Sequence, residues 1–345
     1  MCRLSAEVPA NRAGFSVCFS IGAGGADHRA VALGQNRHQH TKRIMTSSQR
    51  ALSGTALASL LLVALMMAGN HVAARLAFNH GVDVATAVAF RSLATALVVS
   101  ALLVLQRQAV RTSPRQRRFL LLIGLLIGVQ SLCLYSAVAR LPVALALLAF
   151  NTYPLSAALW DRLLYQHRPE RAVLVAMPFI LAGLALALDV LGAASGLGAL
   201  GQWGRIGAGV AFALGASATF GLAMILTQRE VSGLDSRFRT ASTMTITGLV
   251  ALAAVAGQGG FALPQALPGW WGLGALMFLY GTAFTIMFTV LPRLGVAGNL
   301  AIMNVEPVFA LGLAWVILGQ SIALVQVGGA FLVVACVIVL GLRRR

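Results

Sequence analysis

The sequence predicts an all-α integral membrane protein with ten transmembrane helices, built as two inverted repeats of five helices. Hydrophobic residues make up 59% of the chain and charged residues only 10%. Apolar runs close to the roughly 20 residues that cross a bilayer recur along the chain. One segment of 15 residues occurs twice, which indicates an internal duplication.

The chain begins with a basic segment, residues 1–50, which we expect to be a disordered cytoplasmic tail. Residues 1–44 contain no apolar run long enough for a span or for the core of a signal peptide. Met45 opens a short polar stretch that leads directly into the first apolar run. A second hypothesis is therefore that residues 1–44 come from a start site upstream of the native one.

Two groups of apolar runs follow, separated by a Gly-rich linker expected at residues 191–205. The first repeat, residues 51–190, is predicted to contain helices at 55–77, 82–105, 119–138, 142–164 and 171–189. The second repeat, residues 206–342, is predicted to contain helices at 206–227, 240–257, 270–291, 296–318 and 323–342, before a basic end at 343–345.

The duplicated segment relates the two halves. Residues 140–154 and 293–307 align without a gap at an offset of 153, and seven of the fifteen positions are identical. They open the fourth and the ninth predicted helices, which are five spans apart. An odd number of spans reverses the direction of the chain through the membrane, so the halves are predicted to be inverted relative to one another. The identical pairs are Arg140/Arg293, Leu141/Leu294, Val143/Val296, Ala144/Ala297, Leu147/Leu300, Asn151/Asn304 and Pro154/Pro307.

The net charge of +17 is explained by membrane orientation. With both termini on one side of ten spans, all but four of the 26 basic residues fall on that side or in the adjoining helix ends, the exceptions being Arg75, Arg91, Arg140 and Arg205. This asymmetry follows the positive-inside rule, so both termini are predicted to be cytoplasmic and the protein to lie in the inner (plasma) membrane. No nucleic-acid partner is needed to explain the charge.

Motifs for enzymatic chemistry are absent from the sequence. The four Cys have no CxxC spacing, and there is no Walker loop, HExxH or nucleophile elbow. Of the six His, only His71 lies within a predicted helix. We therefore expect no enzymatic activity, no cofactor and no metal site.

Glu306 is the most informative polar residue, because it is the only acidic residue well inside a predicted span. An ionisable side chain at that depth costs several kcal/mol unless it is paired, protonated or faces water. Two interpretations remain open: a site for a substrate ammonium or a coupling proton, and a structural carboxylate that holds helices together, for example through Arg91. Asn299, Met303 and Glu306 share one helical face, and Tyr153 occupies the position of Glu306 in the first repeat.

Other polar residues inside the predicted spans have ordinary structural interpretations. Arg91 is expected to be a structural anchor. Asn151 and Asn304 each precede the shared proline by three residues and are expected to satisfy the backbone where Pro154 and Pro307 interrupt the helix. Asn70 in the first predicted helix is as suited to lining a cavity as to packing between helices.

Ten spans in two halves, an Arg in the second helix, and a ninth helix that reads Met303-Asn-Val-Glu-Pro-Val-Phe-Ala and ends Leu318-Gly-Gln together resemble the EamA branch of the drug/metabolite transporter superfamily. The resemblance covers residues 52–342 and departs from the family at Gln320, where an acidic residue is common. It implies a ten-helix inverted-repeat fold with a substrate cavity between the halves. By resemblance, the cavity maps onto Asn70, Tyr135, Asn151, Tyr153, Tyr280 and Glu306. Asn299, on the same predicted helical face as Glu306, is a further cavity candidate.

The sequence therefore predicts a secondary transporter that exports amino acids or small metabolites by alternating access. Its expected partners are a small-molecule substrate, the lipid bilayer and protons as a coupling ion. Three alternatives stay open: efflux of amphipathic drugs, an integral-membrane enzyme, and a membrane scaffold that transports nothing.

Overall fold

The computed structural model describes residues 54–106, 112–167, 171–189, 191–192, 196–289, 305–320 and 323–343. This part of the chain is helical and contains no strand, which confirms the predicted all-α class. Seven helical segments in it are long and apolar enough to cross a membrane, and three shorter apolar helices accompany them. The helices are α2 (Gly54–Phe78), α3 (Val84–Leu105), α4 (Pro114–Arg140), α5 (Val143–Phe150), α6 (Tyr153–Tyr165), α7 (Arg171–Ala187), α8 (Gly198–Glu230), α9 (Ser236–Gly257), α10 (Leu267–Thr289), α11 (Glu306–Leu318) and α12 (Leu324–Arg343).

Most predicted spans match a helix within a few residues, but the linker does not. Helix α8 begins at Gly198, so the second part of the segment expected as a loop is helical. Its first turns are held against the end of α7, because the buried Gln202 donates from Nε2 to the carbonyl of Leu188 (3.1 Å). The high Gly content alone suggested a loop, and this tertiary contact stabilises a helix instead.

The predicted helix 142–164 is interrupted. Helix α5 ends at Phe150 and α6 begins at Tyr153, with Pro154 in its first turn. Proline is tolerated there because the first amides of a helix have no carbonyl partner within it. Together, Val143–Tyr165 still form a segment long enough to span a bilayer.

At the equivalent place in the second half, the described residues also show the start of a helix. Helix α11 begins at Glu306, and Pro307 lies in its first turn. The sequence predicted that Glu306 lies well inside a helix. In the structure it occupies the N-terminal turn of α11. A carboxylate is favoured at that end by the helix dipole. Asn299 and Asn304 lie outside the described residues.

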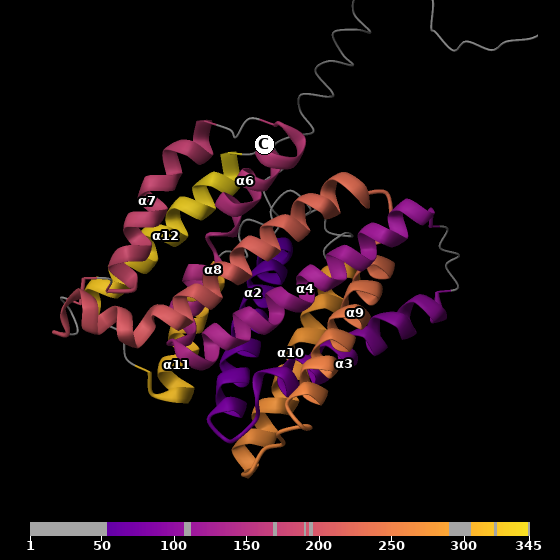
Figure 1. The fold of residues 1–345 in the computed structure, drawn as a ribbon, viewed down its shortest axis with the longest axis horizontal. Coiled ribbons are helices and arrows are strands. Elements are labelled where there is room, and N and C mark those ends of the chain that lie inside the picture. Colours follow the sequence, from indigo (N-terminus) through magenta and orange to yellow (C-terminus); the bar gives the residue numbers. More distant parts are fainter. Residues whose placement is uncertain are drawn as a thin grey trace, which may run out of the picture. The chain divides into compact units, whose positions relative to one another are not determined.

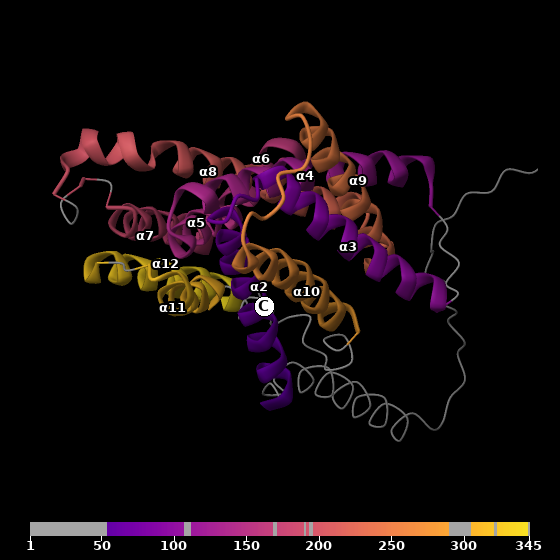
Figure 2. The same cartoon turned by 90° about the horizontal axis from the view of Figure 1, so that it is seen from below.

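The helices of the two halves correspond at the offset of 153 residues, and the correspondence is exact for α6 and α11. Their packing follows the same relation. Helix α4 packs on α8 as α10 packs on α2, and α6 packs on α8 as α11 packs on α2. Equivalent helices also pair directly, α3 with α9 and α7 with α12. Figures 1 and 2 show α7 and α12 side by side at one end of the helices and α3 with α9 at the other.

Close helix contacts depend on glycine at two interfaces, α10 with α2 and α8 with α6. A Cβ on Gly272 of α10 would lie 2.7 Å from the backbone nitrogen of Ala77 in α2. A Cβ on Gly221 of α8 would lie 2.7 Å from the backbone nitrogen of Ala157 in α6. Small residues allow this backbone approach, which is a common way for helices to associate in membranes.

Large apolar side chains also cover outward-facing positions. Trp271, Val316 and Leu324 are 70%, 72% and 89% exposed, respectively. In water such a surface would aggregate, whereas in a bilayer it contacts lipid tails. The exposed apolar faces and the apolar spans together indicate a multi-pass membrane protein.

Candidate functional site

Five helices contribute side chains to one polar network inside these apolar spans. Tyr135 of α4 is fully buried and connects α3 with α2. Its hydroxyl accepts a hydrogen bond from Arg91 Nη1 of α3 (3.1 Å) and donates one to Asn70 Oδ1 of α2 (3.2 Å). We define the polar network as Asn70, His71, Arg91, Ser131, Tyr135, Tyr280 and Glu306.

Arg91 is almost completely buried, with 3% of its surface exposed. Besides Tyr135, its guanidinium donates from Nη2 to Ser131 Oγ (2.9 Å). It also lies over two aromatic rings, 4.1 Å from the centroid of Tyr280 in α10 and 4.8 Å from that of Tyr135. Cation–π contacts of this kind offset part of the cost of burying the charge. All of these partners are electrically neutral.

Glu306 pairs with His71. The distance between Glu306 Oε1 and His71 Nε2 is 3.3 Å, and the two side chains are 22% and 7% exposed. The His71 ring lies 5.4 Å from the ring of Tyr135, which places the pair next to the Tyr135 contacts. A carboxylate from the second half thus meets an imidazole from the first.

In the described residues Glu306 pairs with His71 and not with Arg91, the partner that the sequence suggested as an example. Arg91 contacts α4 and α10, whereas the described partner of Glu306 belongs to α2, against which α11 packs. The sequence showed that His71 was the only His in a predicted span, but it did not show that α2 and α11 are neighbours. His71 and Ser131 are therefore the network residues that sequence reasoning missed.

The structure places the remaining predicted residues of the first half at the break between α5 and α6. Asn151 is buried there. Tyr153, the positional counterpart of Glu306, packs against Phe150 and Phe220, with ring centroids 5.7 and 5.0 Å away. The two equivalent positions therefore have different surroundings, one aromatic and one polar.

A cluster of hydroxyl groups supports the same break. Thr152 Oγ1 donates to the carbonyl of Ala149 (2.8 Å) and lies 3.0 Å from Ser217 Oγ of α8. Ser156 Oγ is 3.1 Å from the same Ser217 oxygen. Hydroxyls that satisfy the backbone are what a helix interruption requires at membrane depth. The sequence analysis did not identify this cluster.

Gln320, where the sequence departs from the family pattern, connects the two halves. Its Oε1 accepts a hydrogen bond from the backbone nitrogen of Val143 at the start of α5 (3.1 Å). Arg75 donates from Nη1 to the carbonyl of Val138 (2.6 Å) near the end of α4. Both side chains satisfy backbone groups at helix termini.

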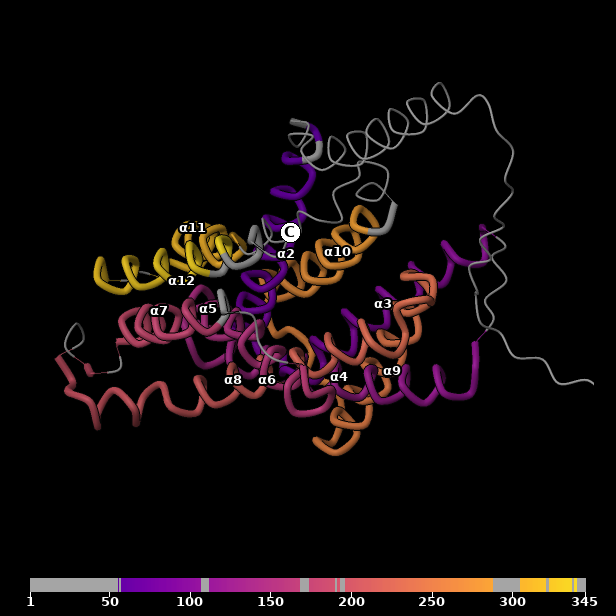
Figure 3. The backbone as a smooth tube through the Cα atoms, turned by 90° about the horizontal axis from the view of Figure 1, so that it is seen from above, coloured from indigo at the N-terminus to yellow at the C-terminus, as the bar shows by residue number. Residues whose placement is uncertain are grey.

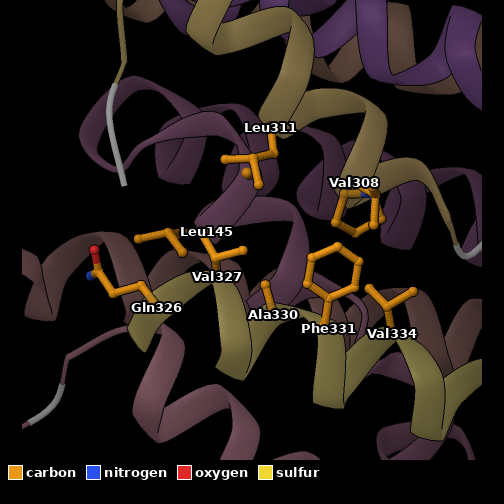
Figure 4. A pocket seen from close by; sticks show the side chains of 10 residues that line it. Leu145, Val308, Leu311, Gln326, Val327, Ala330, Phe331 and Val334 are labelled. Carbon is orange, nitrogen blue, oxygen red and sulfur yellow. The ribbon is translucent and has the colours of Figure 1, made fainter. Parts of the chain in front are cut away.

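An apolar pocket lies between the start of α5 and helices α11 and α12 (Figure 4). Figure 3 shows α11 and α12 next to α5 and α7. The pocket contains Pro307 but no member of the polar network, and its lining suits hydrocarbon rather than a polar solute. The labelled lining residues are Leu145, Val308, Leu311, Gln326, Val327, Ala330, Phe331 and Val334.

Within the described ranges, no three His, Cys, Asp or Glu side chains gather as ligands of a metal ion would. The polar network instead offers a buried cation, a carboxylate, an imidazole and two phenols. Groups of this kind recognise a small charged or polar molecule.

Comparison with known proteins identifies a family. The model of the EamA-like transporter family matches twice, over residues 54–188 and 207–342. No curated protein matches the chain. A solved structure titled only "Crystal structure of protein" has a similar fold, with a TM-score of 0.53 and 18% sequence identity over 81% of this chain and 95% of that one.

Proposed function

Because the chain belongs to the EamA-like transporter family, we propose that it is an inner-membrane secondary transporter that exports amino acids or other small metabolites. The distribution of basic residues supports a cytoplasmic location for both termini. We further propose that the chain has ten spans, arranged as an inverted pair of repeats at residues 51–190 and 206–342.

The observation that carries the proposal is the polar network itself. Asn70, Arg91 and Tyr135 come from the first matched segment, and Tyr280 and Glu306 come from the second. Transporters built from repeats bind substrate at the interface between the halves, where interrupted helices leave polar groups available. Asn151, Tyr153 and Asn299 are proposed to complete the cavity from the two break regions.

The mechanism proposed is alternating access. The two halves rock about the network, which opens in turn to each side of the membrane. Glu306 is proposed to bind a substrate ammonium or a coupling proton. Either event would neutralise the carboxylate and weaken its contact with His71, so binding and the contact between α2 and α11 would be coupled.

A survey of metabolites tests this function. Cells that express the wild-type chain, the Glu306→Gln variant or an empty vector are compared for the small molecules in medium and cytoplasm. We expect one or more amino acids or related metabolites to move to the medium with the wild type only. Glu306→Asp, which keeps the charge, serves as the matched control. Identical profiles for wild type and vector would contradict the proposal.

A further inference from the structure

Besides the ring nitrogen His71 Nδ1, two hydrogen-bond donors of the polar network have no partner among the described residues. They are Asn70 Nδ2 and Arg91 Nε. Both residues are almost fully buried, at 0% and 3% exposed. A buried donor without an acceptor is unfavourable and rare in native proteins, so two of them in one network indicate that an acceptor binds there.

The two residues that carry these donors share one partner. Asn70 Oδ1 and Arg91 Nη1 both hydrogen-bond the hydroxyl of Tyr135, at 3.2 and 3.1 Å. Their other sides, Nδ2 and Nε, are the free ones. Neither group can accept a hydrogen bond, because an amide nitrogen and a guanidinium nitrogen only donate. The missing partner must therefore be an acceptor.

The charge of Arg91 indicates which acceptor fits. Its described partners are two hydroxyls and two aromatic rings, all neutral, so the guanidinium carries a positive charge that no described carboxylate compensates. Truly isolated buried charges are very unfavourable. A carboxylate would supply both the acceptor oxygens and the compensating charge, and guanidinium binds it in a planar, paired geometry.

We propose that Arg91 and Asn70 bind the carboxylate group of the transported substrate, and that Arg91 is thus a specificity-determining residue. This inference rests on the proposed transport function. A dianion such as phosphate fits less well, because Arg91 is the one cationic side chain of the network and Glu306 adds negative charge. With an ammonium near Glu306 and a carboxylate near Arg91, a zwitterion matches both ends of the network.

The test uses Asn70→Asp, which changes size very little but places a carboxylate beside Arg91. It retains the acceptor for Tyr135 and supplies the charge that we assign to the substrate. We expect the melting temperature of the purified protein to rise, because the buried guanidinium gains a counter-ion. We expect export of carboxylate-bearing compounds to fall by on the order of tenfold or more, because the site is already occupied.

Asn79→Asp is the matched control. Asn79 lies at the exposed end of α2, so the same chemical change should alter neither melting temperature nor export. If Asn70→Asp does not accumulate in the membrane, Arg91→Lys provides the second variant. It keeps the charge and removes Nε and the planar guanidinium, and we expect it to lose carboxylate export selectively.

The outcomes separate the two proposals. Wild-type-dependent export of compounds that lack a carboxylate, or unchanged export by a folded Asn70→Asp or Arg91→Lys variant, overturns the role of Arg91 while transport itself stands. If no compound depends on the wild-type chain, the transport function fails and the inference fails with it. For each exported carboxylate, the primary amide of the same compound should compete poorly; equal competition would also overturn the inference.

Discussion

The contact between His71 and Glu306 can be measured by a double-mutant cycle with His71→Ala and Glu306→Ala. At 3.3 Å, a neutral imidazole that donates to a carboxylate contributes about 1.5–3 kcal/mol. Two full charges at that distance would interact by about 5 kcal/mol at an effective dielectric constant near 20. Because the Glu306 side chain is 22% exposed and both groups lose hydration, we expect a coupling energy of about 2 kcal/mol.

The assay is the free energy of unfolding of the four proteins in mixed micelles, by titration with a denaturing detergent. Each single variant should destabilise the protein, and the double variant should be more stable than the sum of the two losses predicts. Additivity within about 0.5 kcal/mol would refute the contact. A control cycle of His71→Ala with Glu230→Ala should be additive, because Glu230 pairs instead with Arg115 and Tyr165.

Two further predictions concern contacts between helices of the two halves. Gly272→Ala should reduce the free energy of unfolding by about 1–3 kcal/mol, because its Cβ would lie 2.7 Å from Ala77 N and 2.8 Å from Ala73 O. Gly274→Ala, two residues on, meets nothing within 4 Å and should be tolerated; equal losses would contradict the close approach. Gln320→Leu should destabilise by about 1–3 kcal/mol, because the Val143 amide loses its acceptor. Gln320→Glu retains an acceptor oxygen and should stay near wild type in the same unfolding assay, so a similar loss for both would exclude this hydrogen bond as the cause.

The helices were predictable to the extent that they depend on local composition. The apolar runs predicted most of the helices. Pro154 and Pro307, at equivalent positions of the repeat, lie in the first turns of α6 and α11, which begin at equivalent positions. The start of α8 was not predictable in this way, since it depends on a contact from Gln202 to Leu188, the residue that follows α7. The local hydrophobic pattern of a sequence does not predict contacts between segments distant in the chain.

The residues of the candidate site were likewise predictable in part, and their contacts were not. Glu306 was conspicuous as a carboxylate among apolar residues, but its partner depends on α11 packing against α2. Arg91 was predicted to be a structural anchor, and its contacts with Ser131, Tyr135 and Tyr280 arise only when α3, α4 and α10 come together. The sequence identified the unusual residues, and tertiary packing decided which of them meet.

The most direct test of alternating access is the accessibility of position 306 from each side of the membrane. In a background where the four Cys are replaced, Glu306→Cys is treated with a membrane-impermeant thiol reagent in right-side-out and inside-out vesicles. We expect labelling from both sides. Ala310→Cys, one turn further along α11 at a fully buried position, should resist labelling. Labelling of position 306 from one side only, or from neither, would contradict a site that opens alternately to the two sides.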